Sequence, residues 1–353
     1  MVSPAGIKTR ICMISDTHTC PPNPSQFTSY AYRAPLPEAD VLLHAGDLTK
    51  VGYQTEHKTM VSMLKTAPAE LKLVIAGNHD ITLDEEHFTS FGYRRQLKSV
   101  RLGHSETLLE NDATSLVQTI RNSPVPLPDT MKTYVRSIKD LYTNDAARAA
   151  GIHYLDEGTH TFTLSSGAQL TVYASPYQPE FCRWAFAYPR SQDRFNPPLP
   201  GSTRPAPQNP VPDFPAVDIM LTHGPPAGVL DGVGRDPVTH VGCGHLLRAA
   251  ERARPRLYLF GHIHEGWGAV RGTWDSFASG GIRQESIDRD QEEMLEKRGA
   301  FYDVSAQSER PLRVGAETLF VNASICTLSY QPLNAPWVVD LDLPCAEEQV
   351  KPE

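Results

Sequence analysis

The sequence lacks several features that would place it in a common class of protein. No apolar run reaches the 18 residues of a membrane-spanning helix, and residues 1–8 contain no apolar signal region. The net charge is −8, and Lys and Arg form no cluster. Because long nucleic acids and anionic membranes are bound through clustered positive charge, we expect neither as a partner. These absences predict a cytoplasmic protein.

Cysteine is sparse and dispersed. The six cysteines include no Cys-x-x-Cys pair, so the sequence predicts neither a disulfide framework nor a zinc site made of thiolates. One of them, Cys12, falls inside a predicted strand, where a free cysteine is usually a small buried apolar residue. We expect all six thiols to be reduced.

The sequence does contain a set of short, continuous apolar runs. Hydrophobic residues make up 40% of the 353 residues, enough for the core of one large α/β domain spanning residues 1–353. Continuous runs are typical of parallel strands that are buried on both faces. The runs are residues 11–14, 41–43, 71–76, 219–221 and 257–260. A helix predicted near residues 55–65 completes a βαβ unit with the second and third runs.

The longer connections between these runs have distinct compositions. Residues 81–150 show helical periodicity and predict a helical insertion. Residues 153–164 and 169–174 alternate in polarity and predict an antiparallel hairpin. Residues 189–215 contain nine prolines and predict an extended surface loop, which either covers the site or only links its neighbours. The charged residues 283–310 predict a solvated helix.

A short polar motif follows each of the five apolar runs. The motifs are Asp16-Thr17-His18, Gly46-Asp47, Gly77-Asn78-His79-Asp80, Thr222-His223-Gly224 and Gly261-His262-Ile263-His264. Since α/β sheets build their sites at the carboxyl ends of strands, we expect the motifs to meet in one crevice. A single Asp-x-His or His-x-His is more often a solvated or hydrogen-bonded pair. Five such motifs, flanked by Gly, Ser or Thr that permit tight turns, indicate a metal site.

The motifs contain seven side chains of metal-ligating type. These are Asp16, His18, Asp47, Asn78, His223, His262 and His264. Their carboxylate oxygens, amide oxygen and imidazole nitrogens suit borderline divalent metals such as Mn, Fe, Zn or Ni. Seven ligands are too many for one ion and about right for two, and Asp47 can bridge them through its two oxygens. The sequence therefore predicts two divalent metal ions as cofactors.

The same motifs resemble those of the calcineurin-like metallophosphoesterase superfamily over residues 10–325. Residues 175–179, 222–226, 261–268 and 321–324 resemble the metallophosphoesterase-domain-containing branch near class III cyclic-nucleotide phosphodiesterases. The resemblance implies a four-layer α/β/β/α sandwich of two mixed β-sheets. It also implies that Asp16, His18, Asp47 and His264 hold the first ion and that Asp47, Asn78, His223 and His262 hold the second.

The resemblance further implies hydrolysis of a small phosphorylated substrate by a metal-bridging hydroxide. That substrate would be a phosphodiester, such as a cyclic nucleotide, or a phosphomonoester. His79 would protonate the departing oxygen, and Asp80 would orient His79. Two alternatives stay open: the same chemistry on a specialised metabolite, and a catalytically silent scaffold with this fold. The sequence indicates no oligomeric state.

Substrate recognition is the least well defined part of the sequence. We expect contacts from Asn78 in its motif, from Tyr177 where the chain leaves a strand, and from Trp267 beside Gly266 and Gly268. Further aromatic residues follow Tyr177 and are predicted to pack in the core rather than to form a stacking wall: Phe181, Trp184 and Phe186. No basic clamp for a terminal phosphate is evident near the motifs, which favours a diester.

Overall fold

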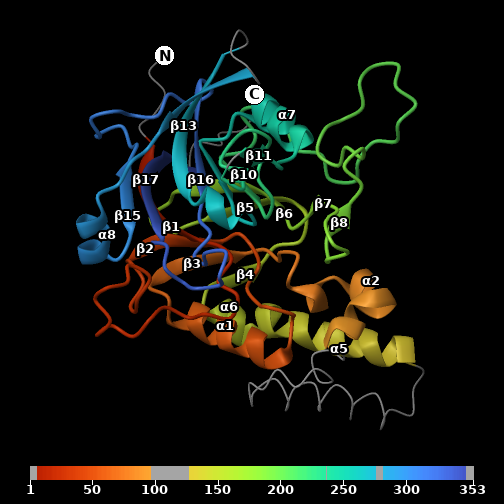
Figure 1. Ribbon diagram of the computed structural model, residues 1–353. Coiled ribbons are helices and arrows are strands. Elements are labelled where there is room, and N and C mark those ends of the chain that lie inside the picture. The colour runs from red at the N-terminus through yellow and green to blue at the C-terminus, as the bar shows by residue number, and fades with distance from the viewer. Residues whose placement is uncertain (1–5, 97–126, 236, 276–280, 347–353) are drawn as a thin grey trace.

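Two mixed β-sheets lie face to face in the centre of the protein, with helices on both outer faces (Figure 1). The computed structural model describes residues 6–96, 127–235, 237–275 and 281–346. In spatial order, the first sheet contains β15 (Ala300–Asp303), β17 (Trp337–Leu343), β1 (Ile7–Ile14), β2 (Ala39–His44), β3 (Ala69–Val74) and β4 (Ile152–Tyr154). The second contains β14 (Ile282–Ser286), β13 (Gly268–Trp274), β16 (Glu317–Asn322), β12 (Leu257–Phe260), β9 (Ile219–Thr222), β6 (Gln169–Ser175) and β5 (Gly158–Thr163). This confirms the predicted four-layer α/β/β/α sandwich.

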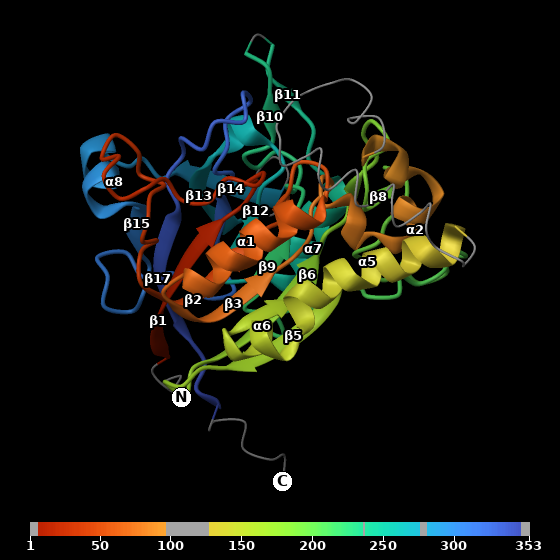
Figure 2. The ribbon, with the colours of Figure 1, turned by 90° about the horizontal axis from the view of Figure 1, so that it is seen from below.

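Three apolar cores separate the four layers. The core between the sheets includes Ile11 and Val321. The outer face of the first sheet packs under α1 (Gln54–Thr66), α5 (Leu127–Thr143) and α6 (Asp145–Ala149), which Figure 2 shows lying across that sheet. The outer face of the second sheet packs under α7 (Gly244–Ala253). Because successive strand residues point to opposite faces, Ile11 and Cys12 of β1 enter different cores, which explains the continuous apolar run.

The five predicted runs form strands β1, β2, β3, β9 and β12, and they bring their carboxyl ends together. In the first sheet, β1 pairs in parallel with β2, and β2 with β3. In the second sheet, β9 and β12 are also parallel neighbours. A parallel bridge between Ser15 and Ser324 connects the end of β1 to the segment that follows β16. The carboxyl ends of the two sheets therefore meet at one edge of the sandwich.

The predicted hairpin over 153–164 and 169–174 is only partly correct. Strands β5 and β6 pair antiparallel as predicted. The first residues of the segment form β4 instead, which pairs in parallel with β3 in the other sheet. Alternating polarity continues through both strands, so the sequence pattern does not reveal that the chain crosses between the sheets at residues 155–157.

The charged residues 283–310 are not one solvated helix. Only α8 (Gln291–Lys297) is helical, and strands β14 and β15 flank it. These strands form an outer edge of each sheet, and β14 pairs with only one neighbour. Edge strands expose part of their surface to solvent and tolerate charged residues, which explains why their composition resembles that of a surface helix.

The described parts of the insertion 81–150 are helical, as predicted. They contain η1 (Ile81–Leu83), α2 (Glu85–His87), η2 (Phe88–Gly92), α5 and α6, whereas residues 97–126 lie outside the described part of the chain. Across the described ranges, no helix is both long enough and apolar enough to cross a membrane.

The proline-rich residues 189–215 form no helix or strand and pack against α7. The Arg252 guanidinium donates to the carbonyl of Val211 at 3.0 Å, and the Asn196 amide donates to the carbonyl of His245 at 2.9 Å. The loop is therefore anchored on the outer helix of the second sheet. Two short strand pairs lie outside the main sheets: β7 (Gln178–Pro179) with β8 (Ala187–Tyr188), and β10 (Gly232–Val233) with β11 (Thr239–His240).

Candidate metal centre

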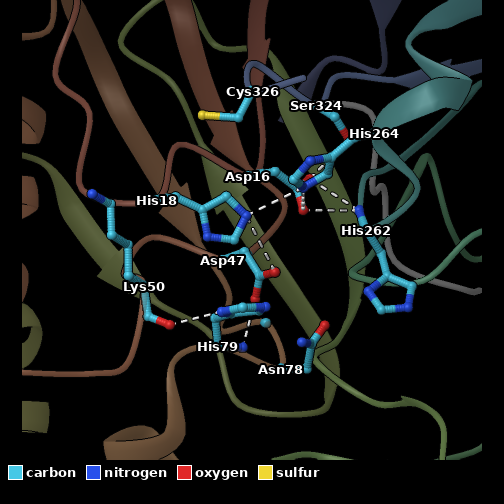
Figure 3. A network of polar contacts seen from close by, with 12 residues as sticks. Asp16, His18, Asp47, Lys50, Asn78, His79, His262, His264, Ser324 and Cys326 are labelled. Atoms are coloured by element: carbon cyan, nitrogen blue, oxygen red, sulfur yellow. Dashed lines mark hydrogen bonds and ion pairs between the residues drawn. The ribbon is translucent and has the colours of Figure 1, made fainter. Parts of the chain in front are cut away.

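The predicted ligands form two neighbouring triads at the edge where the two sheets meet (Figure 3). The first triad is Asp16, His18 and His264, and the second is Asp47, His223 and His262. Within each triad, one ligand atom from each residue lies within 4.8 Å of the others. Each triad takes residues from loops of both sheets, because Asp16, His18 and Asp47 follow strands of the first sheet and the remaining histidines follow β9 and β12.

Asp47 lies between the two triads. Its Oδ2 is 3.7 Å from His18 Nε2, and its Oδ1 is 3.5 Å from His223 Nε2. The amide oxygen of Asn78 joins the second triad, 2.9 Å from His223 Nε2. The structure therefore brings all seven predicted ligands together, with Asp47 beside a histidine of each triad.

Backbone carbonyls orient three of the imidazole rings. The Nδ1 atoms of His18, His223 and His264 donate to the carbonyls of Thr49, Ala45 and Thr327 at 3.2, 2.9 and 3.0 Å. Since a carbonyl can only accept, Nδ1 carries the proton and Nε2 of the neutral ring is left free as a metal ligand. His18 Nε2 and His264 Nε2 face each other at 3.2 Å, a separation at which a proton or a cation must lie between the two nitrogens. The donor set therefore fits a cation.

Burial and charge move the pKa values of the histidines in opposite directions. Burial lowers the pKa of His18 to about 3 and, together with the neighbouring His223, that of His262 to about 4. Burial acts in the same direction on His223 and His264. The carboxylates of Asp47 and Asp16 outweigh it and raise both pKa values to about 9. Since a metal binds only the neutral imidazole, protons compete with a cation for His223 and His264 at neutral pH.

Several ligands lie on strained backbone. Asp16, His18, Asp47 and His262 have φ values of 50°, 43°, 53° and 67°, in the left-handed region that residues with a Cβ rarely adopt. Such conformations cost on the order of 1–3 kcal/mol each and concentrate at functional sites. Hydrogen bonds hold this backbone in place, for example from Asp16 N to the Gly46 carbonyl at 2.9 Å and from His18 N to the Asp47 carbonyl at 3.0 Å.

Two glycines of the motifs are required by the close approach of carboxylates. A Cβ on Gly77 would lie 2.3 Å from Asp47 Oδ1, and a Cβ on Gly261 would lie 2.0 Å from Asp16 Oδ2. Both distances are far below van der Waals contact. The sequence had attributed these glycines to tight turns, whereas the structure shows that they make room for the ligands.

His79 lies beside the cluster, but Asp80 does not orient it as predicted. His79 N donates to Asp47 Oδ1, and its Nδ1 donates to the Lys50 carbonyl, both at 2.7 Å (Figure 3). Asp80 is fully buried and accepts from the backbone N–H groups of Leu48, Thr49 and Gly77. That carboxylate therefore holds the two ligand loops against each other. Burial and the nearby Asp47 raise the pKa of Asp80 to about 7.

Two of the predicted substrate contacts are engaged elsewhere. The ring of Tyr177 is covered by the Arg194 guanidinium, 3.6 Å from its centroid. The indole of Trp267 donates to the Ala335 carbonyl at 3.0 Å and packs against Trp337 beside the core between the sheets. These contacts do not bring either ring beside the ligands, and a substrate contact of Tyr177 or Trp267 stays a prediction. Asn78, the third predicted contact, lies within the cluster.

Two aromatic residues that the sequence did not assign to the site lie beside it, and we call Trp184 and Tyr330 the aromatic rim. Trp184 is partly buried against the core on the outer face of the first sheet, in line with the predicted core packing, and its ring also stacks on His79 with centroids 4.0 Å apart. The Tyr330 ring lies edge-on to His18, with centroids 4.7 Å apart, and to His264, with centroids 5.6 Å apart. Tyr330 lies shortly after β16, another parallel strand that ends at this edge. That position is the one signal in the sequence that could have assigned Tyr330 to the site.

The other aromatic residues near Tyr177 differ in burial. Phe186 is 6% exposed, which confirms the predicted core packing. Phe181 is 64% exposed, so the same prediction is wrong for this residue. The reversal follows from positive φ angles at Cys182 and Arg183, which turn the chain between the two phenylalanines.

Comparison with known proteins agrees with the fold and the ligand cluster, which together define a metal-binding α/β/β/α protein. Residues 9–157 match the sequence profile of the calcineurin-like phosphoesterases. The chain is 31% identical over 337 residues to Metallophosphoesterase domain-containing protein 1 of Homo sapiens and to that of Mus musculus. Each alignment covers 95% of this chain and 72% of the relative.

A more distant similarity links the chain to part of a larger protein. It is 29% identical over 268 residues to Probable rhamnogalacturonate lyase C of Emericella nidulans, covering 75% of this chain but 18% of that protein. The extent of the first two alignments is decisive. The chain belongs to the calcineurin-like metallophosphoesterase family.

Proposed function

We propose that the protein is a metal-dependent phosphoesterase that hydrolyses a small phosphodiester, such as a cyclic nucleotide, or a phosphomonoester. The observation that carries this proposal is the pair of triads joined by Asp47, with the Nε2 atoms of His18 and His264 facing each other. Membership of the calcineurin-like family supports the same class of reaction.

Each ion would have its own ligand set and would share Asp47. The first set is Asp16, His18, Asp47 and His264, and the second is Asp47, Asn78, His223 and His262. Two bound ions of Mn, Fe, Zn or Ni would acidify water to supply the nucleophile and would neutralise charge on the phosphoryl oxygens. Ser324 supports the first set, because its hydroxyl donates to Asp16 Oδ2 at 2.9 Å and so helps to fix that carboxylate.

His79 is the proposed proton donor to the departing oxygen. The Lys50 carbonyl accepts from Nδ1, so Nε2 is the atom from which a proton would be transferred. The hydrogen bond from His79 N to Asp47 Oδ1 ties this ring to the bridging ligand. Proton donation and metal binding therefore depend on the same short segment, residues 77–80.

Tyr330 is the proposed substrate contact. It is 43% exposed, and its ring lies edge-on to His18, His79 and His264. An uncharged substituent of the phosphate group would pack against this ring at low cost. A second substituent is present in a diester and absent in a monoester, so Tyr330 favours a diester.

Metal counting followed by a panel of esters tests the proposal. The protein is stripped of metal, reloaded with Mn, Fe, Zn or Ni, and assayed with bis-nitrophenyl phosphate, nitrophenyl phosphate and the 2′,3′- and 3′,5′-cyclic nucleotides. We expect two ions per chain and faster hydrolysis of diesters. A chain that binds two ions and hydrolyses none of these esters would be a scaffold or would act on another metabolite. A chain that retains no metal contradicts the proposal.

A further inference from the structure

His79 is one member of a three-layer stack that the proposed reaction does not require. The planes of the His79 and Trp184 rings are inclined by 25°, and their centroids are 4.0 Å apart. The Arg95 guanidinium lies 3.8 Å from the centroid of the same Trp184 ring. Two groups this close to one ring cannot share a face of it. Trp184 is therefore sandwiched between His79 and Arg95, and neither of its faces is free for a substrate.

The stack complements the hydrogen bonds of His79. Its backbone N–H and its Nδ1 are already fixed, by Asp47 and by the Lys50 carbonyl. Trp184 covers one face of the imidazole, and His18 approaches edge-on with centroids 4.8 Å apart and planes at 80°. These contacts restrict rotation of the ring beyond what the hydrogen bonds alone would do. They also set the direction of Nε2, the proposed proton-donating atom.

The segment that carries Trp184 is itself tightly held. Cys182, Arg183 and Phe186 have φ values of 52°, 54° and 53°, in the left-handed region. Arg95 donates to the carbonyls of Cys182 and Arg183 at 2.6 and 3.2 Å. Backbone strain of this kind persists only where the surroundings over-determine it. The segment is therefore built to hold one conformation.

The helical insertion also holds the chain just after Trp184. Phe186 N donates to Asp84 Oδ2 at 2.8 Å, and Asp84 also caps α2. Arg95 and Asp84 both belong to the insertion 81–150. The insertion thus reaches the metal centre through Trp184, and this gives it a role that its sequence did not suggest.

We propose that Trp184, clamped by Arg95, is a positioning residue that holds His79 in the orientation needed for proton donation. The inference rests on the proposed function. Small misplacements of a reacting group are costly, and one of about 1 Å can lower a rate by about 10²-fold. Loss of the stack should therefore reduce kcat without removing the metal ions and without changing KM.

Trp184→Leu, Trp184→Phe and Arg95→Met test the stack in the full-length, metal-loaded protein. For an alkyl phosphodiester, Trp184→Leu should lower kcat by about 10- to 100-fold, and Arg95→Met by less. Trp184→Phe should restore most of the loss because it keeps an aromatic face. With bis-nitrophenyl phosphate the effects should shrink, since nitrophenolate leaves without a proton. Matched controls are Phe181→Leu, in the same segment and exposed, and Arg94→Met, beside Arg95.

A double-mutant cycle separates positioning from direct substrate contact. If Trp184 acts through His79, adding Trp184→Leu to His79→Ala should cause no further loss of kcat. Multiplying losses would overturn the inference, and so would a variant that loses its metal together with its activity.

An NMR measurement tests the same inference without any assay. The Nδ1–H signal of His79, assigned by its absence in His79→Ala, should be protected from solvent exchange in the wild type and in Trp184→Phe. It should be lost in Trp184→Leu, and an unchanged signal there contradicts the positioning role. If the wild type hydrolyses none of the esters, the proposed function fails, whereas this measurement still decides how His79 is held.

Discussion

The ligand cluster lies in short loops at the ends of central strands, whereas the aromatic rim comes from two longer segments, 181–186 and 324–333. Asp16, His18 and His223 are completely buried, and Tyr330 is 43% exposed. The ligands are fixed by backbone carbonyls and by the sheets themselves. The rim is fixed by the insertion and by local turns. The difference indicates that the sandwich positions the candidate metal ligands, while its connections position the aromatic rings beside them.

The largest effect is expected from the residue that joins the two triads. Asp47→Asn removes the bridging carboxylate, and because one cation supplies several kcal/mol of transition-state stabilisation, kcat/KM should fall by about 10³-fold or more. Metal content per chain, measured by elemental analysis, should fall as well. Asp156→Asn is the control, because that carboxylate is exposed and pairs with Lys139. Full activity with two ions in Asp47→Asn would show that the strand-end loops do not define the chemistry.

The next largest effect is expected at the boundary between cluster and rim. His79→Ala should lower the rate for alkyl esters by about 10²- to 10⁴-fold and the rate for nitrophenyl esters by less, because the better leaving group needs no proton. Two ions per chain should remain. The half-buried His160, on β5, provides the control substitution, His160→Ala. Unchanged hydrolysis of an alkyl ester would remove His79 from the mechanism.

A pH dependence of metal binding would sharpen the description of the cluster. The pKa values of His223 and His264 are raised to about 9, so both rings carry a proton at neutral pH that a cation must displace. Apparent affinity should rise with pH up to about 9, by up to about tenfold per pH unit for each ring, and then level off. His18 and His262, with pKa values of about 3 and 4, should not contribute. Calorimetric titration between pH 6 and 9 measures this, and an affinity independent of pH would contradict it.

The smallest effect is expected at Tyr330. Tyr330→Leu should raise KM for a diester by about 2- to 10-fold and leave kcat and metal content nearly unchanged, because the ring contributes packing rather than chemistry. Steady-state kinetics on diester and monoester substrates measure the difference. Leu328→Ala, an exposed residue of the same segment, is the control. An equal loss on both classes of ester would argue against a contact with the second substituent.

The sequence predicts the cluster better than the rim for a physical reason. Strands buried on both faces leave continuous apolar runs, and parallel pairing brings their ends together, so Asp16, Asp47 and His223 are placed by local pattern and sheet geometry. The sequence could not show that the Lys50 carbonyl, rather than Asp80, orients His79. Asp80 follows His79 directly, whereas Lys50 lies 29 residues earlier in the chain and reaches the ring only through the fold.

The rim depends on contacts between residues that are distant in the chain. Trp184 reaches His79 across more than 100 residues, and the turn that directs it depends on positive φ angles at residues whose side chains give no such signal. The same limitation explains the error at β4. Local polarity predicts that a strand exists, but it does not identify the sheet that the strand will join.

Each triad takes ligands from both sheets, and this has a consequence for the whole molecule. A cation bound to either triad would cross-link the two halves of the sandwich. Ion binding should therefore stabilise the fold, by about 2.7 kcal/mol for each site at a free metal concentration 100 times its Kd. A chelator should lower the melting temperature of the wild type and have little effect on Asp47→Asn. The metal centre would then hold the two sheets together, and removal of the ions would lower heat resistance and activity in parallel.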